Sequence, residues 1–259
     1  MSGFSRRDFL KLGGATVAAG VLGAYAPRVL AAGSAADFRI FKHGRRDQAE
    51  IALSYDDCHL VTKLQNLEKM LLEQPEVRVT FFPTGEALLR THEKDAGIWQ
   101  RLLDAGHEVG THTFDHVNPG IRSTQNLLED YEKWLAALAQ VTERMPFVRF
   151  ARPPYGNLSP SYQEMCAARG LVATMWSASW GGELALAQKN IDLAENGDVV
   201  LMHISSQDVN RNTPYILSFL AERGLRSVTM SKLYFAALEE DLGVNGCATG
   251  GYFGRNCPE

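Results

Sequence analysis

The sequence lacks several features that would place it in a protein class at once. It has four cysteines, which are too scattered for a metal-binding cysteine cluster. Its body has no basic cluster and the formal net charge is −4, so nothing points to a nucleic-acid surface. Repeats, low-complexity segments and an interdomain linker are also missing. With 45% hydrophobic residues among 259, the chain is predicted to form one large domain with a substantial core.

The first residues, 1–32, differ in composition from the rest. A pair of arginines precedes an apolar run at 12–26, and small residues follow around Ala31 and Ala32. This arrangement resembles the twin-arginine export signal, whose usual pattern is matched by Ser5, Arg6, Arg7, Phe9, Leu10 and Lys11. The resemblance implies cleavage, transport by the twin-arginine translocase and a periplasmic or extracellular location. An uncleaved anchor is the alternative, but the run is short and rich in Gly and Ala, so no stable membrane span is expected in the mature chain.

The main domain is predicted over residues 37–240, and a Gly- and Cys-containing tail follows at 241–259. In an oxidising compartment, Cys247 and Cys257 of this tail could close a small loop. The sequence leaves open whether they do.

Short apolar runs alternate with longer amphipathic stretches along the main domain. The runs that predict strands are EIALSY, VRVTFF, HEVGTHT, FVRFARP, LVATMWS, DVVLMH and RSVTM. Between them, apolar residues recur at three-and-four spacing, which predicts helices. This alternation is typical of an α/β fold with a parallel sheet. About seven strands of this kind predict either a barrel or an open doubly wound sheet.

In both architectures, ligands bind at the C-terminal ends of the strands. Chemically reactive side chains follow four of the predicted strands: Asp56 and Asp57, His112 and His116, Arg152 and Tyr155, and His203. The sequence therefore predicts a functional site at this edge of the sheet.

The segment HTFDH places His112 and His116 four residues apart. On a helical turn, this spacing puts both imidazoles on one face, which is a common arrangement of metal ligands. A carboxylate from another strand end would complete a two-histidine, one-carboxylate set with positions left for water and substrate. The alternative is that His112 is a core residue and His116 a surface residue.

Several motifs together resemble the polysaccharide deacetylases of carbohydrate esterase family four, the chitooligosaccharide- and peptidoglycan-deacetylase-like group. The motifs are SYDDC, GHEVGTHTFDH, RPPYG and VVLMH, and they occur in order between about residues 51 and 234. The resemblance implies an α/β fold of the polysaccharide-deacetylase type, a distorted (β/α) barrel with about seven parallel strands.

The resemblance also implies a role for each strand-end residue. Asp57, His112 and His116 would bind one divalent metal ion, with zinc the first choice and cobalt, nickel or iron as alternatives. Asp56 would be the general base and Arg152 would hold it in place. The main-chain N–H of Tyr155 would help to bind the oxyanion, and His203 would protonate the departing amine.

Further positions carry weaker expectations. The residues implied to bind substrate are Trp176, Trp180, Leu201 and Pro154. Both tryptophans could equally be core residues. Cys58 stands where the family usually has glycine, and a small buried side chain is expected there.

The fourth family motif is altered. Its first aspartate corresponds to Ser179, and Gly182 and Glu183 replace the later Asp-Trp pair. In the family, that aspartate orients the general-acid histidine. A serine would stabilise the imidazolium of His203 less, so the acid step is the weak point of the prediction.

The resulting hypothesis is a metal-dependent hydrolase that removes N-acetyl, or alternatively O-acetyl, groups from an acetylated envelope or extracellular polysaccharide. The altered fourth motif leaves a same-fold hydrolase of another amide or imide as one alternative. A saccharide-binding protein without catalysis is another. A non-haem iron oxygenase would suit the ligands, but the strand–helix alternation speaks against the all-β folds of that class.

Overall fold

Strand β2 (Glu50–Asp57) shows how the sequence builds this domain. Successive residues on a strand point to opposite sides. Ile51, Leu53 and Tyr55 belong to the larger apolar cluster, whereas Ala52 belongs to a second, smaller one. The strand is buried on both faces, which is why it reads as an unbroken apolar run and not as an alternating one.

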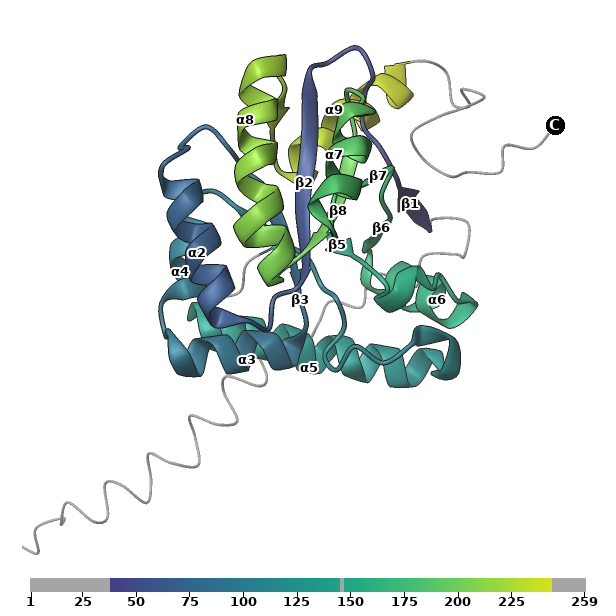
Figure 1. Cartoon of the computed structure of the whole chain (residues 1–259). Coiled ribbons are helices and arrows are strands. Elements are labelled where there is room, and N and C mark those ends of the chain that lie inside the picture. The colour runs from purple at the N-terminus through teal and green to yellow at the C-terminus, as the bar shows by residue number, and fades with distance from the viewer. Residues whose placement is uncertain (1–37, 145–146, 244–259) are drawn as a thin grey trace, which may run out of the picture. The chain divides into compact units, whose positions relative to one another are not determined.

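The computed structural model describes residues 38–144 and 147–243 (Figure 1). The predictions for residues 1–32 and for Cys247 and Cys257 lie outside these ranges. The predicted domain boundary at residue 240 falls inside helix α9 (Met230–Gly243).

The described strands form two sheets, and every ladder between named strands is parallel, whereas an isolated antiparallel bridge pairs His43 with Asp198. One sheet has the order β1-β6-β5, and the other has the order β4-β3-β2-β8-β7 with β9 also on β2. An isolated parallel bridge between Thr111 and Ala151 links them. The remaining strands are β1 (Arg39–Phe41), β3 (Val79–Pro83), β4 (Glu108–Val109), β5 (Phe150–Ala151), β6 (Val172–Thr174), β7 (Ala178–Ser179), β8 (Val199–His203) and β9 (Arg226–Ser227).

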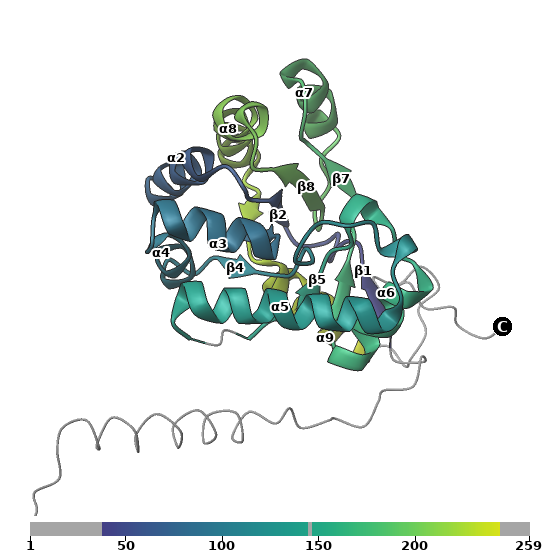
Figure 2. The same cartoon turned by 90° about the horizontal axis from the view of Figure 1, so that it is seen from below.

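Helices surround the strands, as Figure 2 shows. They are α2 (Val61–Leu72), α3 (Gly85–Lys94), α4 (Ile98–Asp104), α5 (Thr124–Thr142), α6 (Pro160–Arg169), α7 (Leu184–Asp192), α8 (Thr213–Arg223) and α9, with short turns η2 (Pro119–Ile121), η3 (Pro154–Gly156) and η4 (Asp208–Asn212). The α/β barrel expected from the sequence is confirmed. Strands β1 and β7 were not among the predicted strands.

The two apolar clusters explain where a site can form. The larger cluster fills the space between the strands and the outer helices. The smaller one lies inside the barrel and includes Phe82, Phe150 and Val199 together with Leu233 and Tyr234 of α9. Because apolar side chains fill this interior, the polar side chains of the inner face lie near the C-terminal ends of the strands. Within the described ranges, no helix is both long and apolar enough to cross a membrane.

His107, which precedes β4, predicts a pH dependence of folding. Its Nδ1 accepts a hydrogen bond from the Val79 N–H at 3.3 Å, and burial lowers the pKa of His107 to about 4. Because its pKa in the unfolded chain is near 6.5, the unfolded state binds more protons between these values, and the contribution of His107 is lost as pH falls from about 6.5 to about 4. The loss is at most roughly 3 kcal/mol.

In His107→Asn, the amide oxygen can still accept from Val79 but does not titrate. Chemical unfolding measured between pH 7 and pH 4 should show a shallower loss of stability in this variant than in the wild type. Parallel pH curves for the two proteins would contradict the assignment.

Candidate active site

The inner face of β2 turns polar at its C-terminal end. Ser54 and Asp56 are two residues apart and so point the same way, into the barrel. Both accept a hydrogen bond from Nη1 of Arg152, at 2.7 Å each. Asp56 is only 3% exposed and Arg152 is fully buried. A buried carboxylate is tolerated here because its counter-ion is buried with it.

Two further contacts fix the Arg152 side chain. Its guanidinium lies over the ring of Phe82, 4.1 Å from the centroid, and its Nε points to the Thr174 carbonyl oxygen at 3.4 Å. The chain enters this position through β5, just before the consecutive prolines at 153 and 154. Strand-end placement and aromatic stacking thus hold the guanidinium against Asp56.

Asp57 leaves the strand direction. It has φ 66° and Cys58 has φ 61°, both in the left-handed region that non-glycine residues rarely adopt. This explains why a glycine would suit position 58. The Cys58 side chain is fully buried, its S–H donates to the Tyr55 carbonyl at 3.4 Å, and burial raises its thiol pKa. Cys58 therefore packs as a small core residue, as expected.

His112 and His116 lie in a loop after β4, so the helical turn expected for their spacing is wrong. Thr113 and His116 have φ 64° and φ 58°, and these two left-handed residues turn the chain back on itself. The imidazoles meet with ring centroids 4.9 Å apart. A four-residue spacing therefore brings the two side chains together here through a tight loop.

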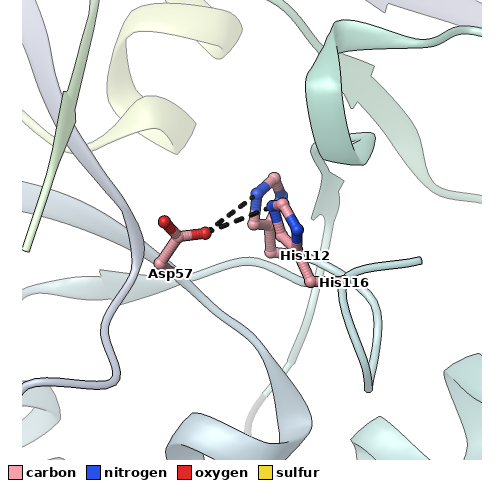
Figure 3. A group of neighbouring side chains, drawn as sticks. All are labelled: Asp57, His112 and His116. Carbon is pink, nitrogen blue, oxygen red and sulfur yellow. Dashed lines mark ion pairs between the residues drawn. The ribbon is translucent and has the colours of Figure 1, made fainter. Parts of the chain in front are cut away.

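Asp57, His112 and His116 converge on one point (Figure 3). Oδ1 of Asp57 lies 3.6 Å from Nε2 of His112 and 3.3 Å from Nε2 of His116, and one ligand atom from each residue falls within 4.8 Å of the others. Two imidazole nitrogens and a carboxylate oxygen form a donor set that could hold a divalent metal ion.

The hydrogen bonding of His112 leaves its Nε2 available as a metal ligand. Its Nδ1 lies 2.8 Å from the carbonyl oxygen of Arg152, so Nδ1 carries the proton and Nε2 keeps its lone pair. Burial lowers the pKa of His112, against the opposing pull of Asp56 and Asp57. The neutral form, which is the one that binds metal, is thereby favoured.

Helix α5 anchors the histidine loop through Asp130, a residue that the sequence analysis missed. Oδ1 of Asp130 accepts a hydrogen bond from the Phe114 N–H at 2.8 Å, and burial raises the pKa of this carboxyl to about 6. The signal was available: Asp130 lies among the buried positions Leu127, Tyr131 and Trp134 of the amphipathic helix. A carboxylate on an apolar face indicates a polar partner in the interior.

Tyr155 lies at the mouth of the site. It has φ 59°, its side chain is 70% exposed, and its ring packs edge-to-face on His116 with centroids 4.8 Å apart. Pro154 is buried beside it in η3. The predicted role of the Tyr155 main-chain N–H in binding an oxyanion stays a prediction.

The ladder between β2 and β8 places His203 next to Asp56. Asp56 and His203 are partners in this ladder, so their side chains emerge on the same side of adjacent strands. The His203 side chain is about half exposed. Ser179 lies on β7 with an exposed side chain, and its main-chain carbonyl accepts a hydrogen bond from Asn190.

The residues expected to bind substrate are in different environments. Trp180 is fully buried and packs edge-to-face against Phe219, so its indole is a core group and cannot line an open groove as placed. Trp176 is partly buried near Gly156. Leu201 is 9% exposed on β8. The contacts of Trp176, Leu201 and Pro154 with a substrate stay predictions.

Comparison with known proteins identifies the family. Residues 43–173 match the polysaccharide deacetylase family, and the chain belongs to it. Residues 3–23 match the twin-arginine translocation signal sequence, so the chain carries an export signal. The family match contains the aspartate pair, both site histidines, Arg152 and Tyr155, and it ends before Ser179 and His203.

Two curated relatives are deacetylases of bacterial cell walls. The chain is 28% identical over 194 residues to the peptidoglycan-N-acetylglucosamine deacetylase PgdA of Listeria monocytogenes, covering 73% of this chain and 40% of the relative. It is 27% identical over 209 residues to a peptidoglycan-N-acetylglucosamine deacetylase of Bacillus cereus, covering 76% of this chain and 72% of the relative. The chain thus spans well under half the length of the Listeria protein.

Solved structures agree on the fold. The Bc1960 peptidoglycan N-acetylglucosamine deacetylase superposes with a TM-score of 0.64 at 25% identity, covering 75% of this chain and 92% of that one. A family-four pseudoenzyme from Bacillus anthracis superposes with a TM-score of 0.66 at 19% identity, covering 75% and 68%. The second likeness concerns the fold alone.

The anchoring of the histidine loop gives a prediction about metal affinity. Asp130→Ala removes the acceptor of the Phe114 N–H, so the loop should hold its two histidines less firmly. Loss of a supporting contact of this kind lowers metal affinity by about 10- to 100-fold. Titration with Zn²⁺ against a competing chelator measures the change.

Asp130→Asn is the matched control, because its amide oxygen can still accept that hydrogen bond. It should bind Zn²⁺ more tightly than Asp130→Ala does. If the folded alanine variant binds with wild-type affinity, Asp130 does not support the site.

Proposed function

We propose that this protein is a metal-dependent hydrolase that removes N-acetyl groups, or alternatively O-acetyl groups, from an acetylated envelope or extracellular polysaccharide. One observation carries the proposal. A buried carboxylate, Asp56, is held by Arg152 beside a second carboxylate that faces two histidines, and His203 emerges on the neighbouring strand. This arrangement provides a base, a metal site and an acid at one edge of the barrel.

Asp57, His112 and His116 would hold the metal ion. Two imidazoles and one carboxylate suit zinc best, and they also accept cobalt, nickel or iron. When bound, such an ion lowers the pKa of a coordinated water and polarises the acetyl carbonyl. The neutral Nε2 of His112 and the convergence of the three side chains fit this assignment.

Asp56 acts as the general base. Its Oδ1 is occupied by Arg152, and its Oδ2 lies 3.8 Å from Nε2 of His112, on the side of the metal site. The free oxygen therefore faces the place where water attacks the acetyl carbon. Asp56 takes the proton of that water as the new C–O bond forms, and Arg152 keeps the carboxylate from rotating away.

His203 completes the reaction. When the C–N bond of the tetrahedral intermediate breaks, the amine needs a proton, and the imidazolium of His203 supplies it. The main-chain N–H of Tyr155 donates to the developing oxyanion. The products are acetate and a free amino group on the sugar.

The relatives and the export signal support the substrate class. The curated relatives act on N-acetylglucosamine in peptidoglycan, which lies outside the cytoplasm. Export through the twin-arginine translocase brings this chain to the same side of the membrane. The exposed ring of Tyr155 offers a flat apolar surface on which a sugar can stack.

A hydrolase of another amide or imide is the second candidate. It is favoured by the altered fourth motif, in which Ser179 is exposed on β7 and Trp180 is buried, so the wall of the site next to β8 differs from the family pattern. Assays on acetylated glucosamine oligomers and on small cyclic amides distinguish the two candidates.

Asp56→Asn tests the base. Acetate release from N-acetylglucosamine oligomers and from peptidoglycan should fall by a factor on the order of 10² to 10⁴, because the amide cannot accept the proton of water. Zn²⁺ content, measured by elemental analysis, should stay at the wild-type level, whereas Asp57→Asn should lose both metal and activity.

Turnover by Asp56→Asn at the wild-type rate would rule out this mechanism. A wild-type protein that holds zinc and binds acetylated oligomers, yet releases no acetate from any of them, would instead support a saccharide-binding protein.

A further inference from the structure

We infer that Asp208 is the positioning residue for His203 and takes over the task of the carboxylate that the family pattern places at position 179. Asp208 is the first residue of the π-helical turn η4, which follows β8. The inference rests on the proposed function, because it concerns the group that protonates the leaving amine.

The Asp208 carboxylate is buried and fixed on both oxygens. Oδ2 accepts a hydrogen bond from the main-chain N–H of His203 at 2.8 Å and lies 3.8 Å from Nδ1 of its ring. Oδ1 accepts from the Gly182 N–H at 2.8 Å. Asp208 is 2% exposed, so this charge meets the imidazole with little screening by water.

Position 179 cannot serve His203 in this way. The Ser179 side chain is exposed on β7, and Glu183, the acidic residue of that segment, is also exposed. By contrast, Asp208 approaches His203 from the other direction along the chain, five residues after it. Ser205 makes this return possible: its N–H donates to the His203 carbonyl oxygen at 2.9 Å, and its Oγ accepts from the Asp208 N–H at 3.0 Å.

The geometry selects one tautomer of the ring. A carboxylate on the Nδ1 side keeps the proton on Nδ1 and leaves Nε2 to face the substrate. A separation of 3.8 Å is longer than a hydrogen bond, so in this position Asp208 acts on the ring as a nearby negative charge that favours the Nδ1–H form. Nε2–H then gives its proton to the amine, and the Nδ1–H form remains beside Asp208.

Asp208 could also matter only because it stabilises the loop at Gly182, and this structural role needs a control. Asp208 also ties the loop at Gly182 to the end of β8, and Asn212 does the same from one turn later: its Nδ2 donates to the carbonyl oxygens of Trp180 at 3.2 Å and Gly182 at 2.9 Å. Asn212 is fully buried, and its amide bonds to this loop. The same Nδ2 also lies 3.5 Å from Oδ1 of Asp208, a longer contact than those to the loop. Asn212→Ser therefore weakens the loop while the shorter hydrogen bonds of Asp208 to the His203 and Gly182 N–H groups stay in place.

The kinetic test compares Asp208→Asn with Asn212→Ser in the metal-loaded enzyme. On N-acetylglucosamine oligomers, Asp208→Asn should lower kcat by at least about tenfold with little change in KM. On para-nitrophenyl acetate, whose leaving group departs without a proton, its kcat should stay within about threefold of the wild type. Asn212→Ser should affect both substrates alike.

A double-mutant cycle shows whether Asp208 acts through His203. In a His203→Gln background, replacing Asp208 by Asn should cause little further loss, because the group it positions is already absent. Equal losses in both backgrounds, or equal losses on the amide and the activated ester, would overturn the inference.

A measurement without turnover separates this inference from the proposed function. Nuclear magnetic resonance of the isotope-labelled ring nitrogens should show the Nδ1–H tautomer for His203 in the wild type and a shift toward Nε2–H in Asp208→Asn, but not in Asn212→Ser. An unchanged tautomer in Asp208→Asn overturns the inference. A wild type that is inactive on every acetylated polymer refutes the deacetylase function, and the tautomer then decides alone about Asp208.

Discussion

The buried ion pair between Arg152 and Asp56 connects the end of β2 with the loop that carries His112. The guanidinium binds the base carboxylate at 2.7 Å, and the main-chain carbonyl of the same residue lies 2.8 Å from Nδ1 of His112. One residue thus orients the proposed base through its side chain and a proposed metal ligand through its backbone. Removing one partner of a buried pair of this kind lowers the free energy of unfolding by about 3–5 kcal/mol. The same two side chains therefore also contribute to the stability of the fold.

One part of the site lies within the residues that match the family, and the other part lies beyond them. The aspartate pair, the histidine loop and the RPPYG turn lie within the residues that match the family. The acid part lies beyond them, on the edge strand β7, on β8 and on η4. Ser179 lacks the carboxylate of the family pattern, and Asp208 supplies one on the other side of His203. This exchange would keep a negative charge beside the imidazole while changing the wall of the site formed by β7.

Much of the fold and most of the strand-end residues could be predicted because short apolar runs mark most of the strands, and reactive side chains follow four of them. The short strands β1 and β7 lacked such a run. The spacing of His112 and His116 suggested a helix, since positive φ at Thr113 and His116 leaves no mark in the sequence. Asp208 escaped notice because it ends a polar stretch, SSQD, and only the return of the chain in space brings it to His203.

Ser54 has a consequence of its own. Its hydroxyl donates to the Val200 carbonyl oxygen at 2.6 Å while accepting from Arg152 at 2.7 Å, and Val200 lies three residues before His203 on the partner strand. A slip of one residue between β2 and β8 would turn every side chain of one strand to the opposite face. The Ser54 hydroxyl therefore favours this register of the two strands, and with it the spacing between the proposed base, Asp56, and the proposed acid, His203.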